Sequence, residues 1–268
     1  MAHRDLFLLF ALLSLALLIT VWPGPAMSVA SPSSLQLSDT LTDTSTLTNT
    51  SVSHFIYLPV VSRNFRLVPV TVVFDDFSDP GSSWPEVDET DYSTAYVGGE
   101  YRIFVKSPNQ GGGAMHPHFR CVDCVLEVDA RYAADAYGAY GLSFGITEDD
   151  ESFYLFVIRE DLPGEPPYYE IWKVIGGVEP DGPLYTAASP HINPGQSTNH
   201  LRVVREGEDI RVYINGEHVI TVPDDDIIGL FGVGLLAGSG EISGVDVRFD
   251  NFFASTIPSN SKNAFTYD

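Results

Sequence analysis

Carboxylate side chains gather in two similar short sequences that lie far apart in the chain. The first, VVFDDFSD, carries Asp75, Asp76 and Asp79, and the second, VRFDNFFAS, carries Asp250 and Asn251. If the strands that hold them are neighbours, their oxygens and nearby loop carbonyls supply the about six to eight ligands that calcium takes. We therefore predict a structural calcium at Asp75, Asp76 and Asp250. The alternative is that the aspartates cap turns through local backbone N–H groups.

The chain has two cysteines, Cys121 and Cys124, in a Cys-x-x-Cys spacing. A zinc site needs further ligands, and no second cysteine pair or histidine pair at metal spacing follows. A thioredoxin-like redox site needs a βαβ context, which the pattern does not offer. In an exported protein the pair predicts a disulfide that stiffens a tight turn.

The alternation of side chains on extended segments predicts a ligand-binding surface. In YYEIWKV, one face of a strand carries Tyr168, Glu170 and Trp172, and in AYGLSFGI the polar face carries only glycine and serine. Aromatic faces and carboxylates above a floor of small residues suit sugar rings. We predict a trough formed by the following residues: Glu127, Asp129, Tyr168, Glu170 and Trp172. The alternative is that both faces are covered and these aromatics belong to the core.

Other chemistries find little support in the sequence. The histidines fall in loops or beside turns and are interpreted as surface residues, namely His116, His118, His191, His200 and His218. The Gly-rich QGGGAM lacks the lysine and the helix of a phosphate-binding loop. Lys+Arg 14 against Asp+Glu 36 gives a net charge of −22, which argues against nucleic acid and against an anionic membrane surface.

From residue 71 onward, short apolar or alternating runs are cut by Gly, Pro, Asn and Asp, which is typical of an all-β sandwich. Asn215-Gly216 and Gly98-Gly99 predict tight hairpins, because a type I′ turn needs positive φ at both central residues. We expect almost no helix and these strands: 71–77, 94–97, 100–106, 125–132, 140–146, 152–159, 168–175, 200–205, 208–214, 217–222, 229–236 and 244–253. The predicted fold is a two-sheet antiparallel jelly roll.

Residues 71–255 resemble the concanavalin A-like (laminin G-like) jelly roll, in particular exported bacterial domains related to 3-keto-disaccharide hydrolases. The motifs that carry the resemblance are FDDFSDPGSSWP, GGEYRI, YGLSFG, FYLFVI, NHLRVVREGEDIRVYINGEHVITV, GLFGVGLLAGSG and VRFDNFFAS. The resemblance implies that the first and last strands are neighbours, with a structural calcium near their junction. If neither strand is bulged, Phe74 and Phe249 enter the core while Phe77 and Phe252 cover the opposite side.

Retaining glycosidases of this fold carry a Glu-x-Asp-x-x-Glu strand whose outer carboxylates do the chemistry. Glu127-Val-Asp129 matches the first half, but Tyr132 stands where the second glutamate belongs. Without two carboxylates about 5–5.5 Å apart, the retaining mechanism lacks its acid.

The first seventy residues are expected to lie outside this domain. Residues 1–30 have the layout of a secretory signal peptide, and an uncleaved membrane anchor is the alternative. Residues 31–54 are a Ser/Thr-rich linker without apolar density and are predicted to be disordered. Residues 55–70 form an apolar extended segment, and 256–268 form a C-terminal tail.

These observations lead to three hypotheses for a secreted or cell-surface protein. The first is a non-catalytic sandwich that binds carbohydrate or another extracellular ligand, with calcium as its one cofactor. The second is a glycoside hydrolase or lyase of the 3-keto-disaccharide hydrolase type. The third is a structural adhesion or spacer module. None of them involves nucleic acid, or a membrane beyond the signal segment.

Overall fold

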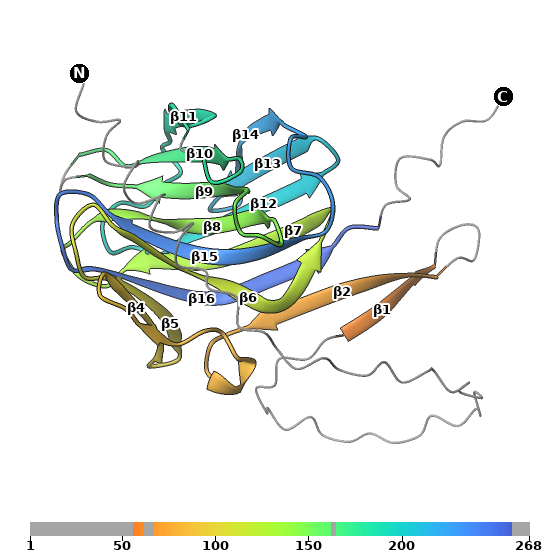
Figure 1. Ribbon diagram of the computed structural model, residues 1–268, viewed down its shortest axis with the longest axis horizontal. Coiled ribbons are helices and arrows are strands. Elements are labelled where there is room, and N and C mark those ends of the chain that lie inside the picture. The colour runs from red at the N-terminus through yellow and green to blue at the C-terminus, as the bar shows by residue number, and fades with distance from the viewer. Residues whose placement is uncertain (1–55, 62–66, 162–164, 179, 259–268) are drawn as a thin grey trace.

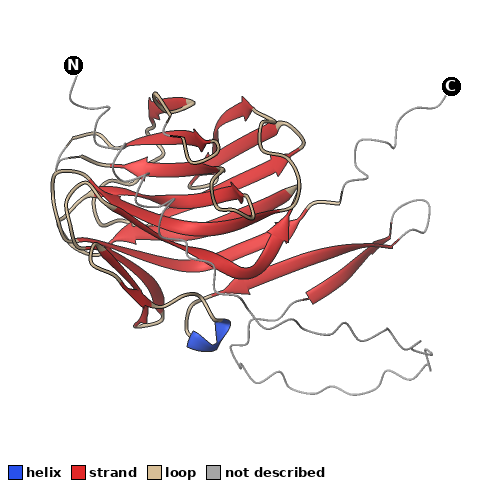
Figure 2. Cartoon of the chain, viewed as in Figure 1, coloured by secondary structure: helices blue, strands red, loops and turns tan. Residues whose placement is uncertain are grey.

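The computed structural model describes residues 56–61, 67–161, 165–178 and 180–258 of the 268-residue chain. The predicted signal peptide and linker lie outside these residues. The described part is built from strands, with one short 3-10 turn at Pro80–Ser82 (Figure 2). Within it, no helix has the length and the apolar character to cross a membrane.

Two antiparallel sheets pack face to face (Figure 1). The larger sheet has ten strands: β1 (Ile56–Val61), β2 (Leu67–Asp75), β3 (Val87–Asp88), β4 (Tyr92–Val97), β5 (Glu100–Val105), β7 (Cys124–Tyr132), β12 (Asn199–Glu206), β13 (Asp209–Ile214), β14 (Glu217–Pro223) and β16 (Val245–Thr256). Its main path runs in the order β14-β13-β12-β7-β16-β5-β4-β3. β2 joins this path at β16, and β1 pairs with β2 in a ribbon that extends away from the sandwich (Figure 1).

The smaller sheet has six strands in the order β11-β10-β9-β8-β15-β6. Their bounds are β6 (Gly111–Cys121), β8 (Gly138–Ile146), β9 (Phe153–Arg159), β10 (Tyr168–Val174), β11 (Tyr185–Ala188) and β15 (Phe231–Ser239). This two-sheet arrangement is the predicted jelly-roll sandwich, so the predicted fold class is confirmed.

Alternation of side chains explains how the core forms between the sheets. On β7 the residues at even positions are buried, whereas Glu127 and Asp129 stay partly exposed. Residues from both sheets, such as Leu126 and Phe156, are fully buried in the same cluster. Burying apolar area in this way contributes roughly 25 cal/mol per Å² and is the main force that holds the sheets together.

The predicted hairpins are present. Asn215 and Gly216 have φ of 52° and 86° between β13 and β14, and Gly98 and Gly99 have φ of 67° and 85° between β4 and β5. Asparagine and glycine tolerate this left-handed conformation better than other residues, which is why these pairs mark the turns.

β6 was not predicted, because GGGAMHPHFRC has the composition of a loop. It lies at the edge of the six-stranded sheet, where a strand can hold a proline without losing a ladder hydrogen bond. Its pairing with β15 shifts register between Gly232 and Gly234, opposite Arg120 and Met115. The intervening segment around Pro117 therefore bulges out of the ladder.

The two similar Asp-containing sequences do lie side by side, since β2 pairs with β16 and Phe74 is opposite Phe253. The predicted orientation of their phenylalanines is wrong at Phe74, which is 50% exposed, and at Phe77 and Phe252, which are buried in the core with Phe249. A bulge in β16 between Asp250 and Phe253 breaks the strict alternation at Phe252, and Phe77 lies beyond the end of β2 with a φ of 54°.

Candidate functional site

The residues predicted to form one trough lie on two different sheets. Glu127 and Asp129 belong to β7 of the ten-stranded sheet, and Tyr168, Glu170 and Trp172 belong to β10 of the six-stranded sheet. Both sets point away from the core that separates the sheets. A single trough that holds all five residues is therefore wrong, because the sequence showed the parity of each strand but not which strands are neighbours.

On the six-stranded sheet, Trp172 lies in a second apolar cluster with Leu155, Val157 and Phe153. Trp172 is only 2% exposed, and its indole Nε1 donates to Glu170 Oε2 at 3.0 Å. Tyr168 is partly exposed, and its hydroxyl donates to Asp161 Oδ2 at 2.8 Å. A ring so deeply buried offers no open face to a sugar, so Trp172 fits the alternative interpretation of a packed aromatic.

On the ten-stranded sheet, Glu127 and Asp129 hold a histidine between them. His200 on β12 is the cross-strand partner of Asp129, and its Nδ1 lies 2.8 Å from Asp129 Oδ1. Its Nε2 lies 3.2 Å from Glu127 Oε2. The side chains are 24% exposed at Glu127, 28% at Asp129 and 37% at His200, so the group is accessible to a ligand.

Asn251 on β16 and Arg202 on β12 extend this cluster to the two strands that flank β7. Asn251 Nδ2 donates to Asp129 Oδ2 at 2.9 Å, and Asn251 owes its position to the bulge, where its φ is 52°. On the other side, Arg202 Nε lies 3.5 Å from Glu127 Oε1, and its guanidinium lies over the Tyr213 ring. We call Glu127, Asp129, His200, Arg202 and Asn251 the charged cluster.

The electrostatics of the charged cluster follow from these contacts. The hydrogen bond from His200 is the largest cause that lowers the pKa of Glu127 below its usual value of 4.5. The bond to Glu127 is likewise the largest cause that raises the pKa of His200 above 6.5. Each partner therefore favours the charged form of the other.

The role of His200 was not predicted from the sequence, where it was interpreted as a surface residue beside a loop. Its partners lie 71 and 73 positions away on β7, and only the strand pairing brings them together. His116 was also interpreted as a surface residue, and this is wrong. It is 3% exposed, stacks on Phe252, and burial lowers its pKa to about 3.

The aspartates predicted to bind calcium are engaged in local hydrogen bonds. Asp75 Oδ1 accepts from the Phe77 backbone N–H at 2.8 Å and Oδ2 from Trp84 Nε1 at 3.0 Å. Asp76 Oδ1 accepts from the backbone N–H and hydroxyl of Ser78, and Asp250 Oδ1 from the Asn251 N–H. These are the contacts of turn-capping aspartates.

In the part of the chain that the structure covers, no three His, Cys, Asp or Glu side chains are grouped so that they could hold a metal ion. The aspartates as placed do not fit a calcium site. Burial raises the pKa of Asp250, and the charges of Glu100, Asp129 and Asp76 add to this effect. Calcium binding stays a prediction, which melting curves in calcium and in chelator would check.

Two further predictions concern β7. Cys121 and Cys124 form a disulfide with their Cα atoms 5.9 Å apart, at the turn that joins β6 to β7. Tyr132, at the position of the missing second glutamate, is 1% exposed and donates its hydroxyl to the Gly138 carbonyl at 2.7 Å. That position points into the core, so it cannot present a side chain to a ligand beside Glu127.

Comparison with protein-family models gives no match, and comparison with curated protein sequences gives none either. Solved structures do match. The chain is similar to Crh5 transglycosylase in complex with NAG, with a TM-score of 0.52, 11% identity and coverage of 70% of this chain and 85% of that one. For an endo-beta-1,3-glucanase from Pyrococcus furiosus the TM-score is 0.49 and the identity 12%, and the match covers 70% of this chain and 94% of that one. For the carbohydrate binding module CBM66 from Bacillus subtilis the TM-score is 0.40 and the identity 18%, and the match covers 68% of this chain and 93% of that one.

The match to Crh5 transglycosylase, at 11% identity, bears on the fold alone. The fold of this chain is a two-sheet antiparallel jelly roll. Since a fold hosts many functions, function has to be argued from the site itself.

Proposed function

We propose that this chain is an exported, non-catalytic β-sandwich domain that binds carbohydrate through the charged cluster. The observation that carries the proposal is the arrangement of Glu127, His200, Asp129 and Asn251 on an accessible sheet face. Export is supported by the signal-like residues 1–30 and by the disulfide between Cys121 and Cys124.

The chemistry of the charged cluster suits the hydroxyl groups of a sugar. Carboxylates accept hydrogen bonds from hydroxyls, and amide and guanidinium groups donate to them, whereas both ring nitrogens of His200 already face Asp129 and Glu127. The Tyr213 ring beside Arg202 adds an apolar surface at the same face. The core position of Tyr132 supports a role in binding over a retaining glycosidase mechanism.

The test is retention of the protein on a panel of immobilised polysaccharides. Hydrogen bonds to charged groups contribute about 1.5–3 kcal/mol each. The double variant Glu127→Gln with Asp129→Asn should therefore weaken binding at least tenfold and leave the fold intact. Glu217→Gln, which changes an exposed carboxylate on edge strand β14, is the matched control and should bind normally.

Two results would contradict the proposal. Equal retention of the double variant and the wild type would place the binding surface elsewhere. No retention of the wild type on any glycan would favour a structural adhesion or spacer role.

A further inference from the structure

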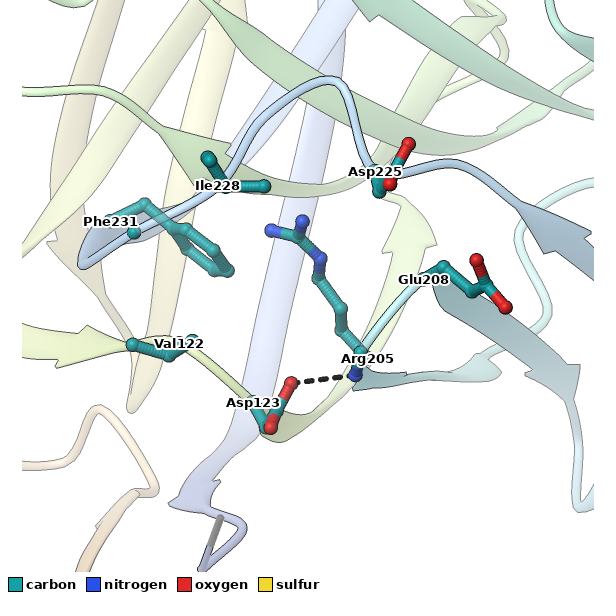
Figure 3. A pocket seen from close by; sticks show the side chains of 9 residues that line it. Val122, Asp123, Arg205, Glu208, Asp225, Ile228 and Phe231 are labelled. Atoms are coloured by element: carbon teal, nitrogen blue, oxygen red, sulfur yellow. Dashed lines mark hydrogen bonds between the residues drawn. The ribbon is translucent and has the colours of Figure 1, made fainter. Parts of the chain in front are cut away.

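A cavity of about 490 Å³ lies where three connections between strands meet (Figure 3). Val122 and Asp123, inside the disulfide-closed turn, form one wall. The connection from β14 to β15 forms another, with Asp225 and Ile228, and Phe231 lies at its inner end. Gly207 and Glu208 of the β12–β13 turn complete the lining.

Arg205, near the end of β12, extends into this cavity. Its side chain has the same strand parity as Leu201 and Val203, so it points between the sheets, and the residue is only 3% exposed. The guanidinium lies 4.5 Å from the centre of the Phe231 ring. Figure 3 shows its tip between Phe231, Ile228 and Asp225.

The guanidinium of Arg205 is only partly satisfied. Nη2 donates to the Ile227 carbonyl, whereas Nε and Nη1 are buried without a hydrogen-bond partner. Among the described residues one other arginine is buried, Arg159, and its Nε lies 2.6 Å from Asp161 Oδ1. Arg205 has no such partner, because no described carboxylate forms an ion pair with it within 4 Å. The guanidinium also lies over the Tyr154 ring. A buried cation with unpaired N–H groups costs folding free energy, which a ligand that supplies the acceptors would offset.

The carboxylates around the cavity are engaged elsewhere or face solvent. Asp123 Oδ1 accepts from the Gly207 backbone N–H at 2.7 Å, drawn as the dashed line in Figure 3. Asp224 accepts from Tyr154 and from Lys173. Glu208 and Asp225 are exposed at the mouth. Burial lowers the pKa of Arg205, and the charges of Asp123, Asp224 and Asp225 act in the opposite direction.

The lining defines a ligand with three features. A desolvated guanidinium forms its strongest hydrogen bonds with an oxyanion such as a carboxylate. The exposed carboxylates of Asp225 and Glu208 accept hydrogen bonds from hydroxyls, and water screens their repulsion of an anion. Val122 and Ile228, 52% and 80% exposed, offer apolar surface to the C–H face of a ring.

We propose that this cavity binds a carboxylate-bearing sugar unit, a uronic acid, with its carboxylate on Arg205 and its hydroxyls toward Asp225 and Glu208. That the ligand is a glycan rests on the proposed function. The residues are separate from the charged cluster, so each site is tested without the other.

The experiment titrates the full chain with glucuronate, glucose and acetate, followed by calorimetry. Glucuronate should bind, and glucose and acetate should each bind at least tenfold more weakly. Arg205→Met keeps an unbranched apolar side chain beside Phe231 and should lose at least tenfold in glucuronate affinity. Arg211→Met, on β13 next to Glu206, removes a surface guanidinium and should bind as the wild type does.

A variant at the mouth keeps the test decisive if Arg205→Met fails to fold. Ile228→Ala shortens an exposed side chain of the lining and should weaken glucuronate binding at least threefold. The melting temperature of the wild type should also rise in glucuronate and not in equimolar glucose, because a ligand of the folded state stabilises by mass action.

The outcomes separate this site from the charged cluster. Equal binding of glucuronate and glucose overturns the carboxylate assignment, and equal binding of acetate and glucuronate overturns the sugar assignment. Undiminished affinity in a folded Arg205→Met overturns the site. The variant Glu127→Gln with Asp129→Asn should bind glucuronate normally even if its retention on polysaccharide is lost. If this variant loses glucuronate binding, the claim that the cavity and the charged cluster are separate sites is overturned.

Discussion

At the scale of residues, the charged cluster depends on His200, whose imidazole is held by two carboxylates of another strand. The surroundings of Arg205 likewise come from distant parts of the chain, because three connections between strands line its cavity. Sequence spacing reports contacts along one strand and says little about contacts across strands. For Arg205 a signal was present, since a charged residue follows Leu201 and Val203 on the core-facing parity of one strand.

We expect the stability of the protein to depend on pH through His200. Its pKa is raised in the folded state, so its contribution is present below pH 6.5 and is lost as pH rises through the folded pKa. The pKa of Glu127 is lowered, so its contribution is present above pH 4.5 and is lost as pH falls through its folded pKa. Both contributions are therefore present between these values.

His200→Gln should remove the loss of stability on the alkaline side. The effect should stay below about 1 kcal/mol, because solvent screens a partly exposed pair. Urea denaturation at pH 5.5 and 8.5 measures it, and His218→Gln, at an exposed histidine bonded to Thr221, is the control. An imidazole that titrates below pH 6.5 by NMR would contradict this prediction.

At the scale of elements, most strands could be predicted because apolar and polar residues alternate along them. β7 and β13 show this alternation and were found. β6 was missed because its glycines and proline are tolerated at a sheet edge, and β3 because it has only two residues. The bulge in β16 was not predictable from alternation, and it decided where Phe252 and Asn251 point.

The bulge at Asn251 provides a test of how this element positions the charged cluster. Its φ of 52° is tolerated by asparagine and glycine but strained for a β-branched residue. Asn251→Val should lower the free energy of unfolding by about 1–2 kcal/mol from backbone strain. Asn251→Gly, which keeps the backbone and removes the bond to Asp129, should cost less. Equal losses in chemical denaturation would show that the hydrogen bond matters and the backbone conformation does not.

At the scale of the whole molecule, the sandwich has outer faces of opposite character. The outer face of β7 and its neighbours carries charged side chains, whereas β9 and β10 carry the second apolar cluster on theirs. Parity alone assigns both sets to outer faces, which is why Trp172 and Glu127 were predicted to share one trough. The difference lies in burial, and a single strand does not reveal how its outer face is packed.

The difference in burial predicts a large loss of stability for one aromatic substitution and a small one for another. Trp172 is 2% exposed in the second apolar cluster, so Trp172→Ala should lower the free energy of unfolding by about 3–5 kcal/mol. Phe74→Ala removes a side chain that is 50% exposed and should change it little. Thermal melting with chemical denaturation measures both. Polysaccharide retention of Trp172→Ala, measured well below its melting temperature, should match the wild type, because the charged cluster lies on the other sheet. A stable Trp172→Ala variant that no longer binds glycan would instead restore the tryptophan as a sugar-stacking residue.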